Sequence, residues 1–163
     1  MDARPPTRLY LGIAAAAGAV LALEIGLTRL FSYAIWYHFA YLAISVALLG
    51  YGAAGSALAA WPRLGRPGAL AWWAVGAEAG VLLALGVIRA LPLDPLALGS
   101  DAGQLVRLLA YYAAVTLPFL CGGFLVAAPL QRYPRAVGRL YFADLIGAAT
   151  RKPPQRKGSV TAA

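Results

Sequence analysis

Charge is scarce in this sequence, and negative charge is the scarcest. Only 12% of the 163 residues are charged and six of them are acidic, whereas 61% belong to the apolar set. A soluble domain usually carries about a quarter of its residues as charged side chains. The few charges here stand between long apolar segments, for which lipid is the suitable solvent. The composition therefore predicts an integral membrane protein.

Cysteine and histidine are almost absent as well. Cys121 has no second cysteine to pair with, which excludes an intrachain disulfide and a Cys-based metal site. His38 stands in an aromatic segment and is expected to be a polar residue at the membrane surface. No metal and no other cofactor is predicted. The net charge of +8 is spread over inter-helix segments and the tail, which predicts membrane topology and no nucleic-acid partner.

Four apolar segments are long enough to cross a bilayer, which takes about 20 residues in a helix. They are residues 9–31, 37–60, 69–90 and 108–130. The predicted fold class is an all-α membrane protein, a bundle of four transmembrane helices in the lipid bilayer. The expected parts are a cytoplasmic N-terminus at 1–8, the helical domain at 9–130, a cytoplasmic loop and amphipathic stretch at 131–149, and a disordered basic tail at 150–163.

The arginines predict the orientation of these helices. Positively charged loops stay in the cytoplasm, so both termini are predicted to be cytoplasmic, in a bacterial inner membrane. The loop residues behind this prediction are Arg4, Arg8, Arg63, Arg66, Arg132, Arg135 and Arg139. A cleaved signal peptide is the alternative for the N-terminus. Glu24 and Arg29 would then fall between its apolar core and the cleavage site, so an uncleaved first helix is preferred.

Two acidic residues fall inside predicted spans. Glu78 lies near the middle of the third, and Glu24 lies in the outer third of the first, within LALEIGLTRLF. An ionised carboxylate in hydrocarbon costs at least a few kcal/mol, so neither should face lipid. Thr28 shares a helix face with Glu24 and can donate a hydrogen bond, whereas Arg29 points toward the outer headgroups. The favoured role is polar contact between helices, and the alternative is movement of protons or cations.

Small residues recur at four-residue spacing and predict close helix packing. The proposed packing residues are Gly18, Ala22 and Gly26 in the first span, Gly52 and Ser56 in the second, and Gly76 and Gly80 in the third. Both acids stand opposite these stripes, so each helix needs neighbours on two sides. A larger bundle, a homo-oligomer or another membrane subunit would supply them. In the fourth span, Pro118 predicts a kink, with a broken helix as the alternative.

Three stretches place polar residues inside apolar surroundings: LALEIGLTRLFS, WYHFAYLAISVALLGYGAAGSALA and GRLYFADLIGAA. Together they resemble the membrane part of spermidine synthase-like integral membrane proteins, over about residues 9–60 and 116–149. The residues that make the resemblance more than composition are Glu24, Thr28, Arg29, Arg139, Tyr141 and Asp144.

The resemblance implies a soluble Rossmann-like aminopropyltransferase domain after the membrane part. No glycine-rich nucleotide loop after a strand is found in this sequence, so this chain alone is not expected to be an aminopropyltransferase. In the family GRLYFADLIGAA leads into a fifth span, whereas here it meets the basic stretch TRKPPQRKGSVTAA. The sequence therefore predicts a truncated start of a fifth helix, with Asp144 near its cytoplasmic end.

Two other functions are compatible with the sequence. One is a small transporter or channel subunit that uses Glu24 and Glu78 as proton or cation sites. The other is an interaction module that binds a second membrane protein through its glycine stripes.

Overall fold

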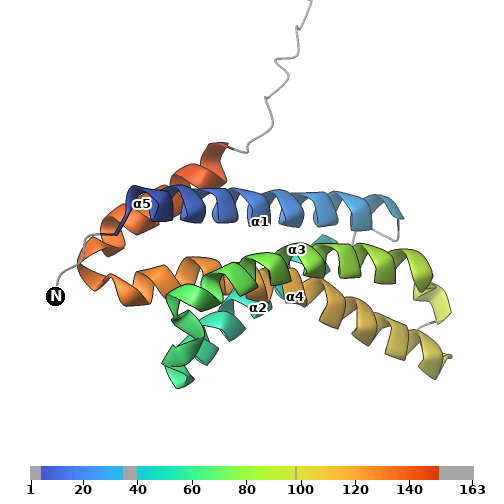
Figure 1. The fold of residues 1–163 in the computed structure, drawn as a ribbon. Helices are drawn as coiled ribbons and strands as arrows, with labels where there is room; N and C mark the ends of the chain where they lie inside the picture. The colour runs from blue at the N-terminus through green and yellow to red at the C-terminus, as the bar shows by residue number, and fades with distance from the viewer. Residues whose placement is uncertain (1–4, 35–39, 98, 151–163) are drawn as a thin grey trace, which may run out of the picture.

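The structure, a computed structural model, describes residues 5–34, 40–97 and 99–150, and over these ranges it is all-helical. Its long helices are α1 (Thr7–Ala34), α2 (Ala40–Ala60), α3 (Pro67–Ala90), α4 (Ala102–Arg132) and α5 (Val137–Thr150), shown in Figure 1. Short 3-10 turns, η2 (Pro62–Gly65), η3 (Pro95–Ala97) and η4 (Pro134–Ala136), connect them. His38 and all but the first residue of the predicted basic tail lie outside the described residues.

Helices α1 to α4 are each long enough and apolar enough to cross a membrane. The prediction of an all-α chain with four such helices is therefore confirmed, and four apolar helices are compatible with an integral membrane protein. α4 begins six residues before the predicted span, because the Asp101 side chain caps it by accepting a hydrogen bond from the Gly103 backbone N–H at 2.8 Å. Hydropathy marks the part of a helix suited to lipid and misses such polar ends.

α4 is the central helix of the bundle. It packs against α1, α2 and α3, and 61% of its most apolar segment is buried, compared with 11% for α3. Phe119 and Val115 of α4 are fully buried, together with Phe31 of α1 and Val46 of α2. α4 is also continuous through Pro118, so the broken-helix alternative is wrong for this proline.

Glycines bring the other helices close to α4. A Cβ atom added to Gly50 of α2 would lie 2.6 Å from the Phe119 Cβ, and one added to Gly80 of α3 would lie 3.0 Å from the Pro118 nitrogen. From α4 itself, a Cβ on Gly122 would lie 2.6 Å from a methyl group of Val20. The helix backbones therefore approach each other closely at Gly50 and Gly80, and Gly122 leaves space for the Val20 side chain.

α5 lies alongside the N-terminal half of α1, and Figure 1 shows the pair at one end of the bundle. The two helices run in the same direction, because Arg139 and Tyr10 share one groove and Gly147, two turns further on, meets the backbone of Ala14. α5 thus gives α1 a neighbour on a second side. The sequence predicted the need for such a neighbour but expected the helix bearing GRLYFADLIGAA to be only a truncated start.

The end of the bundle that holds the α3–α4 connection is tied down by polar side chains. The Tyr111 hydroxyl lies 2.8 Å from the carbonyl of Leu91 and 3.0 Å from that of Ile88, at the C-terminal end of α3. The buried Gln104 side chain accepts a hydrogen bond from the Asp94 backbone N–H. These bonds satisfy helix-end groups that lack partners within the helix.

The close contacts of α4 predict different outcomes for two glycines of α2. Gly50→Ala places a methyl group against the Phe119 backbone and side chain, and we expect it to lower the free energy of unfolding by about 1–3 kcal/mol. Gly52→Ala meets nothing within 4 Å and should leave stability unchanged or slightly raised. Unfolding of both variants by denaturing detergent measures the difference, and equal stabilities would contradict the packing described here.

Candidate functional site

Tyr51 of α2 lies within electrostatic range of two acids that come from two other helices. Tyr51 lies near the middle of α2, and the carboxylates of Asp144 on α5 and Glu24 on α1 both lie within electrostatic range of it. Each of the three side chains is partly buried. We call these residues the polar cluster.

The contact between α2 and α4 sets the position of Tyr51. A Cβ on Gly123 of α4 would lie 3.2 Å from the Tyr51 Cα and 2.8 Å from the Ala54 Cβ. Because α4 has no side chain at this point, the backbone of α2 packs directly on it. The Tyr51 ring packs against the main apolar core, and its hydroxyl is the polar end of an otherwise apolar environment.

Glu24 shares a face of α1 with residues that enter the core. Three buried residues share this face: Val20, four residues before Glu24, Leu27, three residues after it, and Phe31, seven residues after it. Glu24 is therefore turned toward the bundle and away from lipid, as its charge requires. No cationic side chain among the described residues pairs with its carboxylate.

Thr28 does not bind the Glu24 carboxylate. Its hydroxyl donates to the Glu24 main-chain carbonyl at 2.8 Å, and the Ser32 hydroxyl repeats this bond to the Thr28 carbonyl at 2.7 Å. Hydroxyls in apolar helices commonly satisfy themselves on the preceding turn in this way. Arg29 is exposed and lies near the end of α1, on a different face from Glu24.

Asp144 occupies the corresponding position on α5. It shares a helix face with Leu140 and Gly147, which are both buried. Gly147 is the point at which α5 touches α1, so the Asp144 side chain is held on the side of α5 that faces the bundle. The sequence had placed Asp144 at the cytoplasmic end of a fifth helix without assigning it a partner.

Glu78 stands apart from the polar cluster. It lies on the exposed face of α3, opposite Gly76 and Gly80, which face α4. The structure therefore does not bring together Glu24 and Glu78, the pair named for a transporter. Among the described residues no group lies beside Glu78 that would neutralise a carboxylate at that depth.

The small-residue stripes differ in what they contact. Gly76 and Gly80 face Cys121 and Pro118 of α4, and Gly18 is buried. Gly26, Gly52 and Ser56 are exposed, and Ala22 is partly buried. The closest contacts are made by Gly147, at α1, and by Gly50, Gly122 and Gly123. The sequence interpretation did not assign Tyr51 to a site, although a tyrosine in the middle of a span, far from either aromatic end, was a usable signal.

The polar cluster offers chemistry that the rest of the membrane region lacks. Each carboxylate lacks a cationic partner in the described part of the chain and can bind a proton or attract a cation, and a phenol can donate or accept a hydrogen bond. Over the same residues, no three His, Cys, Asp or Glu side chains gather as ligands of a metal ion would. The cluster is therefore suited to protons or to organic or monovalent cations.

Comparison of the chain with protein-family models, curated proteins and solved structures finds no match.

Proposed function

We propose that this chain forms the membrane domain of a spermidine synthase-like integral membrane protein, in a bacterial inner membrane with both termini in the cytoplasm. One observation carries the proposal. The three stretches that resemble the family contribute one residue each to the polar cluster, namely Glu24, Tyr51 and Asp144. Residues from separate resembling stretches thus lie within electrostatic range of one tyrosine, which favours a shared functional origin over a chance similarity of apolar helices.

The domain itself performs no aminopropyl transfer in this proposal. Such chemistry needs a pocket that holds a nucleotide-like donor and an amine, and the described residues form neither a strand nor a glycine-rich loop of that kind. The role of the membrane domain is to hold the polar cluster in the bilayer beside a soluble catalytic domain.

A second candidate is transport of a proton or cation through the polar cluster. It is favoured by the positions of Glu24 and Asp144, which come from different helices and each lie within electrostatic range of Tyr51. This version replaces Glu78 by Asp144, because Glu78 is exposed on α3. Carboxylates that face a bundle interior are the usual binding groups for cations inside membranes.

The membrane-domain proposal predicts the outcome of a domain exchange. Residues 9–149 should replace the equivalent membrane segment of a full-length spermidine synthase-like protein, and the chimera should still insert and make spermidine from decarboxylated S-adenosylmethionine and putrescine. The isolated chain should make none. An inactive or unstable chimera, or turnover by the purified chain above a membrane-only control, would contradict the proposal.

The two roles of Glu24 predict different effects of the same substitutions. If the carboxylate only joins helices, Glu24→Gln should be tolerated and Glu24→Leu should weaken helix association by roughly 0.5–2 kcal/mol. If it carries cations, Glu24→Gln and Asp144→Asn should abolish flux of labelled putrescine or protons into proteoliposomes while assembly stays intact. Glu78→Gln is the matched control and should keep wild-type flux. Equal flux in all three variants would exclude the transport candidate.

The proposed orientation predicts the side of each loop. Reporter fusions after Arg66 and after Arg139 should report the cytoplasm, and a fusion near Gly99 should report the opposite side, because arginine-rich loops are retained in the cytoplasm. A fusion after Arg66 that reports the periplasm would contradict both the orientation and the number of spans.

A further inference from the structure

A groove runs between α1 and α5 on the surface of the bundle. Its volume is about 440 Å³, and it is open along one side. The walls are apolar and include Leu11, Phe142 and Ile146, which are 67%, 63% and 44% exposed. Small residues form its floor, because Ala14 of α1 and Ala143 of α5 line it between these larger side chains. Exposed apolar walls of this kind are expected to meet acyl chains in a bilayer.

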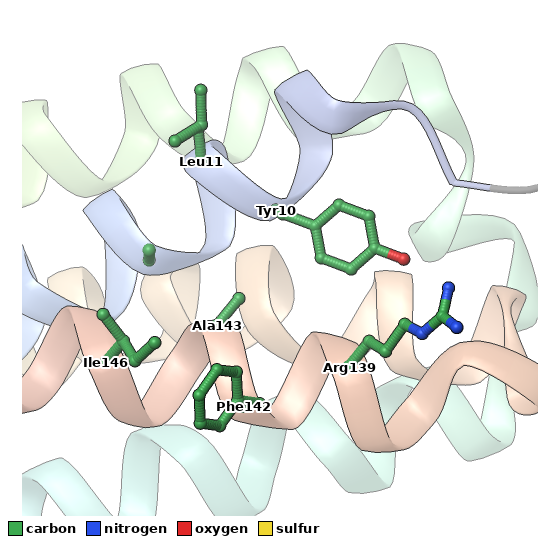
Figure 2. Close-up of a pocket in the computed structure, with 7 residues that line it drawn as sticks. Tyr10, Leu11, Arg139, Phe142, Ala143 and Ile146 are labelled. Carbon is green, nitrogen blue, oxygen red and sulfur yellow. The ribbon is translucent and has the colours of Figure 1, made fainter.

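One end of the groove is polar. Figure 2 shows the Tyr10 hydroxyl and the Arg139 guanidinium on the same side of that end, with Phe142 and Ile146 further along. Arg139 is exposed, and no acidic side chain among the described residues pairs with it. Asp144 stands five residues further along α5, about 7.5 Å up the helix and on another face. The groove therefore combines an apolar channel with an unneutralised cation at its end.

Other arginines lie at the same end of the bundle. Arg8 precedes the groove on α1, Arg66 precedes α3, and Arg132 ends α4. The described acids that are exposed, Glu78, Asp94 and Asp101, lie in the middle of α3 or at the opposite end. This end of the helices thus has a positive potential that attracts anions at the membrane surface.

We propose that this groove binds an anionic phospholipid, with its phosphate on Arg139 and Tyr10 and one acyl chain between α1 and α5. The shape and the charge agree with an amphiphile that has an apolar tail and a negative head. Basic pockets between transmembrane helices at the membrane surface bind such headgroups. The guanidinium fork suits a phosphate, and the tyrosine hydroxyl adds a hydrogen-bond donor.

A second copy of this chain fits the groove less well than a lipid. A copy in the same membrane orientation would need an acidic side chain at the depth of Arg139, and the described residues offer none that is exposed there. In the proposed orientation Arg139 lies at the cytoplasmic membrane surface, which is where phospholipid phosphates lie. The charge of Arg139 therefore favours the lipid as the occupant.

Competition between two lipids tests the proposal. The purified full chain is incubated in a non-ionic detergent with equal amounts of phosphatidylglycerol and phosphatidylcholine that carry the same acyl chains. Native mass spectrometry then counts the lipids retained. We expect the wild-type chain to favour phosphatidylglycerol about fivefold, from one arginine contact. Arg139→Gln should reduce that ratio to near one without loss of helix content.

Two further variants separate a lipid site from a general surface charge. Ala143→Leu fills the floor of the groove and should lower retention of both lipids while Arg139 remains. Arg66→Gln removes a charge from the same end of the bundle but away from the groove, and it should keep the wild-type ratio. An unchanged ratio in Arg139→Gln, or an equal loss in Arg66→Gln, would overturn the proposal. A dimer that Ala143→Leu dissociates would instead assign the groove to a second copy.

Discussion

The bundle depends on backbone contact at the points where α4 and its neighbours have no side chains. In a bilayer, helices gain little from leaving lipid for each other, so their association relies on close van der Waals packing. The contacts of Gly50 with Phe119, Gly80 with Pro118 and Gly122 with Val20 supply that packing around one central helix. Pro118 takes part within a continuous α4, and its ring lies against Gly80 of α3. A side chain at any of these positions would push the helices apart.

The same contacts place the polar cluster. Since α2 rests on Gly123, the backbone at Tyr51 is fixed against α4, and the tyrosine comes within range of Glu24 and Asp144. The acids are held by helices that face the bundle through Val20 and Leu27 on α1 and through Leu140 on α5. Packing of small and apolar residues thus determines which polar groups meet. For this reason the polar cluster lies in the bundle, whereas Glu78, on the least buried span, lies outside it.

Most of the fold could be predicted from the sequence, and most of the site could not. Long apolar segments and arginine-rich loops are local signals, and four helices of suitable length and hydropathy were expected and found. Which residues of different helices come close to each other is not determined by the local sequence. Glu24 and Asp144 stand 120 residues apart in sequence, and both lie within range of Tyr51 because α5 lies beside α1. Periodicity within either helix says nothing about this arrangement. For the same reason the Gly52 and Ser56 stripe looked like the packing face of α2, whereas Gly50, two residues away, makes the contact.

α5 takes part in both the polar cluster and the groove, through different faces of the helix. Where Gly147 meets the backbone of Ala14, the two helices touch and Asp144 is turned toward the bundle. Toward Tyr10 and Arg139 the long side chains on both helices stand along an open groove. A single helix therefore supplies a carboxylate to the polar cluster on its buried face and an arginine to the end of the groove on its exposed face. Ala14 takes part in both features, because its backbone meets Gly147 and its side chain lines the groove together with Ala143. Small residues let the two helices touch, and the larger tyrosine, arginine and phenylalanine side chains stand along the groove beside that contact.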